Sequence, residues 1–253
     1  MKIIKGTLFS LSEHIPAARW CLAMIVIAFT AVVSIYKYID LAETATFSSF
    51  EALFLIITDI TNVIFIYLPL YLFVVCGIMF DSGFGGIEIL RCGSRPAWLA
   101  GKLITYIVNT VIFFGAVFVI NFVVCSRVFY LSDTWSSGFV GVRVMMGYSA
   151  MDFSAPPIPT VIMASVSVLL LYMLCGTVNM LVSLLSGRES AALFFSLFAG
   201  IGLGLLNMSV TTNSGRSQLL RCIVLLTVSA AVYVFCIFAA NKKDLSKGGS
   251  YAG

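Results

Sequence analysis

The chain has 253 residues, of which 60% are hydrophobic and only 10% are charged, and its mean hydropathy is +1.07. A soluble domain of this size cannot cover itself with water-compatible surface at that composition. The formal net charge is +4, yet no basic stripe with interleaved aromatic residues is present. Composition and charge therefore exclude a soluble enzyme and a nucleic-acid-binding protein, and indicate a protein that lies largely in lipid.

Six long apolar runs fill most of the chain, and the charged residues lie almost entirely between them. A helix needs about 20 apolar residues to cross the hydrocarbon core. Only a backbone whose hydrogen bonds close internally is stable there, so runs of this length predict helices. We expect one transmembrane domain over residues 1–253, an all-α polytopic membrane protein. The predicted spans are Arg19–Tyr36, Ala52–Met79, Leu103–Val124, Ile158–Leu185, Ala191–Asn207 and Leu219–Ala240.

Two of the runs have internal features. The second is long enough to tilt or to include an interfacial turn, and Pro69 predicts a kink in it, because proline removes one backbone donor. The fifth is the shortest. It contains Gly200, Gly202 and Gly204 without a preceding strand, which excludes a dinucleotide motif. These glycines predict close helix packing or a bend.

The N-terminal segment, Met1–Trp20, is amphipathic and lacks the compact apolar core of a signal peptide. Residues 1–18 predict a helix that lies on the membrane face, and a frayed polar tail is the alternative. The helical spacing is carried by Ile4, Leu8, Leu11 and Ile15.

Lysine and arginine predict the orientation, because these residues are in excess on the cytoplasmic side of a membrane protein. With both termini cytoplasmic, ten of the 15 cations lie inside and five lie outside. The segment 125–157 is then an external loop, which we expect to lie on the outer leaflet or to be disordered. The cytoplasmic set is Lys2, Lys5, Arg19, Arg91, Arg95, Lys102, Arg188, Lys242, Lys243 and Lys247.

No catalytic or metal-binding constellation is visible, and we expect no enzyme activity in this chain. The one histidine, His14, lies in the amphipathic N-terminal segment. The seven cysteines are scattered, without the spacing of a zinc site or a disulfide framework. Cys125 and Cys222 both lie near the predicted outer face, so a bridge between them is one alternative to free thiols. Gly101-Lys102 lacks the first glycine and the Ser/Thr of a phosphate loop, and no ATP site is expected there.

Asp59 is the one acidic residue well inside a predicted span, with Asn62 beside it. A carboxylate within the membrane is a functional-site candidate, and both residues are candidates for the substrate path. The alternative places Asp59 near the outer interface, about two turns from Glu51. The spans otherwise offer aliphatic and aromatic side chains, which favours an amphipathic or hydrophobic substrate.

The segment 80–102, between the second and third spans, begins with a glycine-rich stretch. Ile87–Arg91 then predicts a short amphipathic helical turn, Gly93-Ser94 ends it, and Pro96 fits the first turn of the next helix. The cations of this segment fall near the inner headgroups. They set the topology in one interpretation and dock a partner in the other.

The pattern Gly86-x-x-x-Leu90, followed by Arg91-Cys-Gly-Ser94-Arg95 and Gly101-Lys102, resembles the first cytoplasmic loop of ABC-2-type transporter permeases. The C-terminal Ala240-Asn-Lys-Lys-Asp-Leu245 is also similar to that family. Six spans, both termini inside, an amphipathic N-terminal helix and a length near 250 residues fit it as well. The long external loop before the fourth span departs from the family pattern, which puts the re-entrant helices usual before the last span in doubt.

The resemblance implies a bacterial, multi-pass plasma-membrane permease of the exporter type, similar to small exporters of amphipathic antimicrobial peptides. Its partners would be a cytosolic ABC ATPase, a second identical or paralogous permease copy and membrane lipids. ATP and Mg would bind the ATPase, so this chain needs no cofactor. Two alternatives remain: a proton-coupled secondary carrier that uses Asp59, and a membrane scaffold or sensor that transports nothing. The residues expected to couple to the ATPase are Ile87, Glu88, Leu90, Arg91, Ser94, Arg95 and Lys102.

Overall fold

A computed structural model describes residues 17–42, 47–79, 94–140, 155–209 and 215–242. Within these ranges the chain is helical and contains no strand, which confirms the predicted all-α class. Residues 1–16 of the predicted N-terminal interfacial helix (1–18) lie outside the described residues, and Ala17 and Ala18 begin the first described helix. The Ile87–Arg91 turn and the C-terminal Lys243–Leu245 also lie outside them. The elements are α2 (Ala17–Ala42), α3 (Ser49–Thr58), η1 (Thr61–Tyr67), α4 (Leu68–Val75), α6 (Arg95–Val128), α8 (Pro157–Ser186), α9 (Glu189–Ser209) and α10 (Gly215–Lys242).

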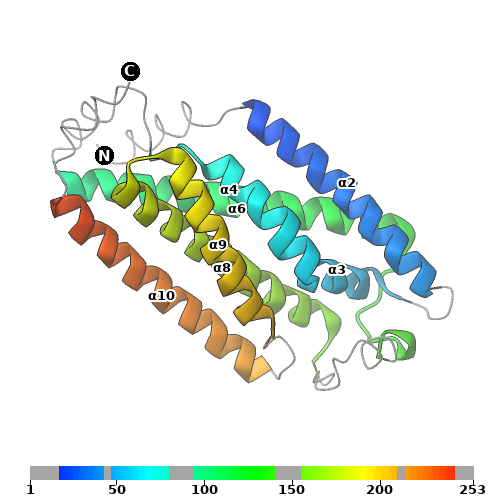
Figure 1. The fold of residues 1–253 in the computed structure, drawn as a ribbon. Coiled ribbons are helices and arrows are strands. Elements are labelled where there is room, and N and C mark those ends of the chain that lie inside the picture. The colour runs from blue at the N-terminus through cyan, green and yellow to red at the C-terminus, as the bar shows by residue number, and fades with distance from the viewer. Residues whose placement is uncertain (1–16, 43–46, 80–93, 141–154, 210–214, 243–253) are drawn as a thin grey trace.

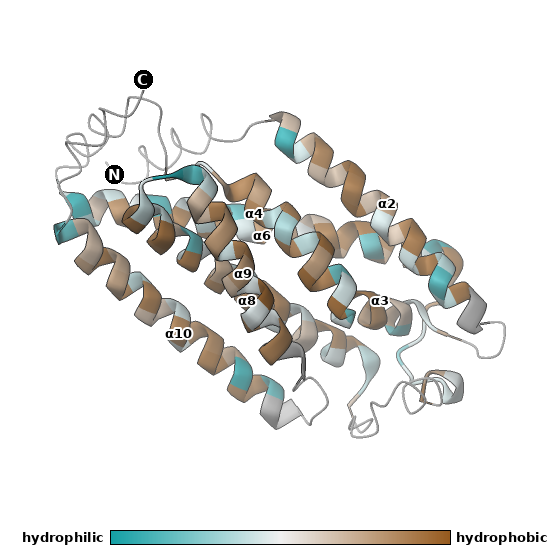
Figure 2. Cartoon of the chain, in the orientation of Figure 1, coloured by the Kyte–Doolittle hydropathy of each residue, from teal (hydrophilic) through white to brown (hydrophobic). Residues whose placement is uncertain are grey.

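Five helices in the described ranges are long and apolar enough to cross a membrane: α2, α6, α8, α9 and α10. A sixth crossing exists if α3 and the following η1–α4 segment count as one bent span. Each predicted run therefore corresponds to a helix or to the bent pair, and the short fifth run forms α9. Apolar residues dominate α9 and α10 along their length, with hydrophilic residues at their ends (Figure 2).

The prediction of a kink at Pro69 is wrong, because the break lies at Asp59–Ile60, ten residues earlier. There α3 and η1–α4 meet at an angle of 57°. Asp59 has extended backbone geometry, and its side chain accepts a hydrogen bond from Thr61 N–H at 3.0 Å. This local bond offers the backbone an alternative to the helical pattern. Pro69 lies in the first turn of α4, where a missing N–H is tolerated.

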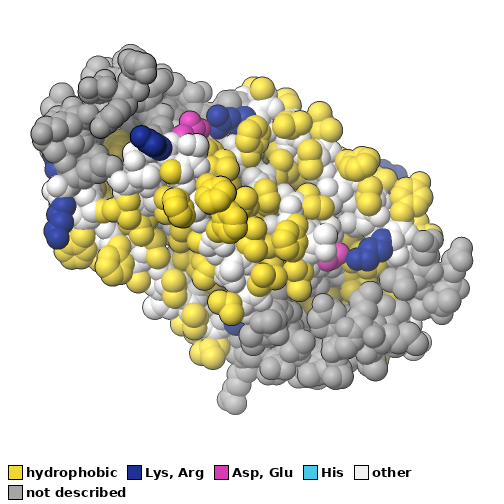
Figure 3. Space-filling model, viewed as in Figure 1, with side chains coloured by type: hydrophobic (Ala, Val, Ile, Leu, Met, Phe, Trp, Pro, Cys, Tyr) yellow, Lys and Arg dark blue, Asp and Glu magenta, His cyan; other side chains and the backbone are white. Residues whose placement is uncertain are grey.

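Helix α8 forms the centre of the bundle, with α6, α9 and α10 packed against it (Figure 1). In its most apolar stretch 61% of the residues are buried, against 11% in α10. On the face shown in Figure 3, hydrophobic side chains cover the middle and cations lie toward the edges. An outer surface of this kind is stable in contact with hydrocarbon rather than with water.

Two glycines of the fifth run let α9 approach the bent segment closely. A Cβ at Gly200 would lie 2.8 Å from Leu68 Cδ2, and a Cβ at Gly204 would lie 2.8 Å from Ile64 Cδ1. Nothing lies within 4 Å of a Cβ at Gly202. The predicted role in close helix packing is thus confirmed for the first and third glycine, and Gly202 faces open space.

Gly204→Leu is expected to lower the free energy of unfolding by about 1–3 kcal/mol, because the side chain must displace Ile64 from a packed contact. Gly202→Leu on the same helix is the matched control and should be close to neutral. Thermal midpoints of the purified variants in detergent measure the difference. Equal midpoints for the two variants would contradict the close contact between α9 and η1.

Candidate functional site

Two ion pairs mark opposite ends of the bundle. At the end that contains the start of α2, Arg19 pairs with Glu189 at 3.6 Å and donates to Cys76 O at 2.6 Å. Toward the other end of α2, Lys37 pairs with Asp59 at 3.2 Å. Arg19 and Lys37 are 18 positions apart in α2, which corresponds to about 27 Å of helix. That length is close to the roughly 30 Å hydrocarbon thickness, so the two pairs are spaced like the two membrane boundaries.

The Asp59 carboxylate stabilises the bent backbone between α3 and η1. One oxygen accepts from Thr61 N–H and the other pairs with Lys37. The Lys37 side chain is 57% exposed and that of Asp59 is 16% exposed. Asn62, a further substrate-path candidate, is buried and donates to Ser34 Oγ of α2 at 3.1 Å. Both candidates thus attach the start of η1 to α2, and the exposed lysine partner favours a position of Asp59 near the membrane boundary.

Asp59→Asn should change the free energy of unfolding by less than about 1 kcal/mol, because an ion pair with an exposed lysine contributes little. The asparagine oxygen can still accept from Thr61 N–H. Asp59→Leu removes that acceptor as well and should cost about 1 kcal/mol more, as the loss of a helix cap does. Thermal unfolding of both variants measures the difference. Identical midpoints would show that the hydrogen bond from Thr61 N–H does not stabilise the bend between α3 and η1.

The start of α6 carries the described part of the predicted ATPase-coupling set. Ser94 caps the helix, and its Oγ accepts from Ala97 N–H at 3.3 Å. Arg95 donates to the backbone oxygens of Ala240 at 3.4 Å and Asn241 at 3.3 Å, where the last carbonyls of α10 lack helical partners. Lys102 is only 2% exposed. The remaining members lie outside the described residues: Ile87, Glu88, Leu90 and Arg91.

A network of buried hydrogen bonds, which we did not predict, crosses the centre of the bundle. The Tyr71 and Thr110 hydroxyls share a hydrogen bond of 2.7 Å, and Thr110 donates to Tyr106 O at 2.7 Å. Tyr106 donates to Asn179 Oδ1 at 2.9 Å, and Asn179 donates to Ser196 Oγ at 3.1 Å. The network joins α4, α6, α8 and α9. Polar residues inside the apolar runs were the available signal, because such side chains bond between membrane helices.

A second unpredicted feature, the Glu51 clasp, consists of Glu51 with Ser48 and Ser136. The Glu51 side chain has no exposed surface and accepts from Ser48 N–H at 2.6 Å. It also accepts from Ser136 N–H, and from Ser136 Oγ at 3.0 Å. The sequence signal is Ser48-x-x-Glu51, the pattern of a helix capping box, and that box is present.

Through its hydrogen bonds to Ser136, the Glu51 clasp attaches part of the predicted external loop to α3. Beside it, the Trp135 and Phe139 rings stack with centroids 4.8 Å apart, and Phe54 of α3 contacts both rings edge-on. In addition, Ser49 N–H donates to Tyr130 O at 2.8 Å. Helix α6 continues to Val128, so the expected loop 125–157 begins inside a helix and then packs over α3 as far as residue 140.

The six cysteines within the described ranges are free thiols, and Cys125 and Cys222 are not bonded to each other. In the same part of the chain, no three His, Cys, Asp or Glu side chains gather as metal ligands.

Comparisons with known proteins give no match. A scan against models of protein families finds none that fits the chain. Searches of curated proteins and of solved structures likewise return no similar protein.

Proposed function

We propose that this chain is the membrane-spanning subunit of an ABC exporter. A separate cytosolic ATPase would bind the segment 80–102, and two copies of the permease, identical or paralogous, would form the translocation path. In this proposal the bent pair is one crossing, which gives six spans with both termini in the cytoplasm. The cargo is amphipathic or hydrophobic: a peptide, a lipid or a lipophilic drug.

The observation that carries the proposal is the contact of Arg95 with the end of α10. Arg95 lies within the segment 80–102, at the start of α6, and donates to backbone oxygens 145 and 146 positions later in the chain. A displacement of that segment therefore acts on the start of α6 and on the end of α10 together. Because α10 packs extensively on α8, the movement would reach the centre of the bundle.

The energy for transport would come from ATP-driven closure of the ATPase dimer. The bundle has two arrangements in this proposal, and the closed and open ATPase dimers would bind them with different affinities. The closed dimer, formed with ATP, would draw the two segments 80–102 together and rock α6 and α10 as rigid bodies. Most buried side chains of the described bundle are aliphatic or aromatic, and Glu51 and Lys102 are the charged ones among them, which suits an amphipathic cargo.

The experiment is co-expression with an ATP-binding-cassette ATPase encoded beside this chain in its genome. The two proteins should purify as one complex and drive ATP-dependent movement of a hydrophobic cationic peptide into inside-out vesicles. Arg91→Glu combined with Arg95→Glu should leave membrane insertion intact and abolish that movement. An intact complex with normal transport in the double variant would overturn the proposal.

The proposed topology is tested by cysteine labelling from outside intact cells, after replacement of the native cysteines. A cysteine at Ser137 should react with a membrane-impermeant maleimide, and cysteines at Ser186 and Ser246 should not. Lysed cells provide the control, since all three positions should then react. External labelling at Ser246 would mean an odd number of crossings, as expected if α3 and η1–α4 do not form one span.

A second candidate, a proton-coupled carrier, is favoured by one observation: Asp59 lies at the break of a bent helix pair. Carboxylates and broken helices at such positions serve ion coupling in secondary transporters. This candidate requires transport driven by a proton gradient without ATP, and Asp59→Asn should abolish it. ATP-driven transport that persists in Asp59→Asn would exclude it.

A further inference from the structure

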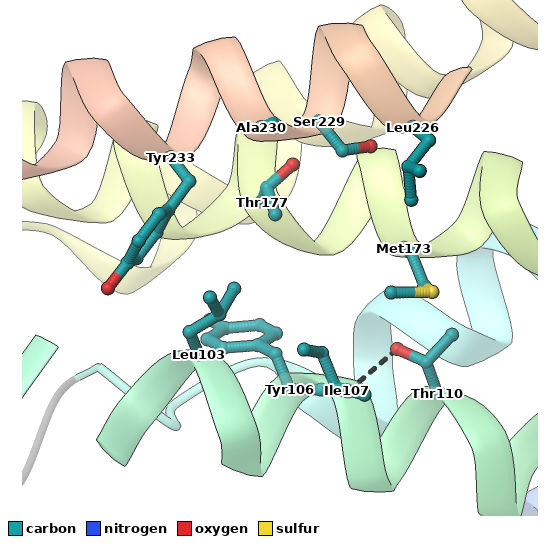
Figure 4. Close-up of a pocket in the computed structure, with 10 residues that line it drawn as sticks. All are labelled: Leu103, Tyr106, Ile107, Thr110, Met173, Thr177, Leu226, Ser229, Ala230 and Tyr233. Atoms are coloured by element: carbon teal, nitrogen blue, oxygen red, sulfur yellow. Dashed lines mark hydrogen bonds between the residues drawn. The ribbon is translucent and has the colours of Figure 1, made fainter. Parts of the chain in front are cut away.

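A cavity of about 220 Å³ lies between α6, α8 and α10 (Figure 4). Its floor is buried and formed by Tyr106, Thr110, Thr177 and Ser229. Its rim on α10 is exposed, at Ala230 and at Leu226, which is 56% exposed. Engineered apolar cavities of about 150 Å³ already hold a benzene molecule, so this volume admits a hydrocarbon ligand.

The cavity is an elongated slot along the helices. On α6 its lining runs from Leu103 to Thr110, and on α10 it runs from Leu226 to Tyr233. Each stretch advances seven residues, or about 10 Å of helix. Leu103 and Tyr233 lie together at one end, and Thr110 and Leu226 lie toward the other (Figure 4). A slot of this shape fits a linear chain better than a compact ring system.

The hydroxyl groups of the floor are all used within the protein. Thr110, Thr177 and Ser229 each donate to a backbone carbonyl one turn earlier in their own helix, at 2.7, 2.8 and 2.8 Å. The fourth hydroxyl, of Tyr106, donates to Asn179 Oδ1. The floor of the slot therefore exposes carbon atoms to a bound molecule. A water molecule there would lack the two to four partners that hold buried water in place.

The Leu103–Tyr233 end of the slot points toward cations. Arg95 lies eight residues before Leu103 on α6, and Lys242 lies nine residues after Tyr233 on α10. These separations correspond to about 12–14 Å of helix. Arg95 joins the two helix ends at this level, and Lys242 is exposed beside it. A ligand with an apolar chain in the slot would carry its polar end to a positively charged site.

We infer that the slot binds one acyl chain of an anionic phospholipid from the surrounding leaflet, with the headgroup at Arg95 and Lys242. The rim opens between two candidate spans, so a chain enters sideways from the hydrocarbon without crossing water. The bound chain would act as a wedge between α6 and α10, the two helices whose ends Arg95 connects. This inference concerns resident lipid and holds whatever cargo the protein moves.

The test uses the chain alone, reconstituted in vesicles with equal amounts of phosphatidylglycerol and phosphatidylcholine. After extraction in mild detergent, native mass spectrometry counts the retained lipids. The wild type should keep one phosphatidylglycerol per chain. Ala230→Trp fills the slot and should lower that occupancy about tenfold. Ala231→Trp is the matched control, because Ala231 is exposed and does not line the slot, and it should retain the lipid.

Two further variants keep the test decisive. Ala230→Leu fills less of the slot, so it should fold even if the tryptophan variant does not, and should lose part of the lipid. Lys242→Gln leaves the slot open and should lower the preference for phosphatidylglycerol about fivefold. Equal retention by the Ala230 and Ala231 variants would overturn the inference, and so would equal retention of both lipids by the wild type. Because no ATPase is present, these results are independent of the proposed transport function.

Discussion

Glu51→Leu should lower the free energy of unfolding by about 3 kcal/mol or more, one of the two largest effects expected in this protein. The substitution leaves the N–H groups of Ser48 and Ser136 without an acceptor where Glu51 itself has no exposed surface. Hydrogen bonds to a charged group contribute about 1.5–3 kcal/mol each. Thermal unfolding in detergent measures the loss, and proteolysis of the segment after α6 should accelerate in parallel.

Two further variants distinguish the loss of the hydrogen bonds of the Glu51 clasp from a general loss of packing. Ser136→Ala removes only the side-chain hydrogen bond and should cost about 1 kcal/mol. Glu51→Gln keeps the shape but turns an amide N–H₂ toward one of the donors, so its cost should lie between the other two. If Glu51→Leu melts no earlier than Ser136→Ala, the clasp does not hold the loop on α3.

Gly176→Ala should cost about 2–3 kcal/mol, because a Cβ at this position would lie 2.5 Å from the Tyr71 hydroxyl. That hydroxyl cannot move aside easily. It is held by Thr110 at 2.7 Å, and the Tyr71 ring stacks on Tyr172 with centroids 5.4 Å apart. The measurement is the thermal midpoint of the purified variant.

The control for this prediction is Gly115→Ala, since nothing lies within 4 Å of a Cβ there. Tyr71→Phe combined with Gly176→Ala should recover most of the loss, because the ring carbon Cζ is 3.6 Å from the added Cβ. The two substitutions should therefore be strongly non-additive. Additive effects would contradict the contact between Tyr71 and Gly176.

The positions of the helices could be predicted because each depends on a contiguous apolar run. The fourth run, predicted as Ile158–Leu185, forms α8 over Pro157–Ser186. The third, predicted as Leu103–Val124, extends to Arg95 and Val128. Here the helix is capped by Ser94, and its extensions beyond the apolar run contain Arg95, Lys102 and Arg127, which interrupt the hydrophobic signal.

The contacts that join the helices could not be predicted, because they connect residues far apart in the chain. Glu51 and Ser136 are 85 positions apart, and Tyr106 and Asn179 are 73 positions apart. The bend in the second run was misplaced for a related reason. Pro69 is the stronger local signal, but a carboxylate that accepts from a backbone N–H two residues later ends α3 at Asp59.

A cross-link between this chain and the proposed ATPase would show directly that the segment 80–102 docks that subunit. A cysteine at Ile87, in a chain otherwise free of cysteine, should form a short bifunctional cross-link to the ATPase in membranes. A cysteine at Ser137, in the segment held on α3, should form none. A cross-link is expected at position 87, and it should be lost in the variant with Arg91→Glu and Arg95→Glu. A complex that hydrolyses ATP and cross-links at position 137, or at neither position, would contradict this expectation.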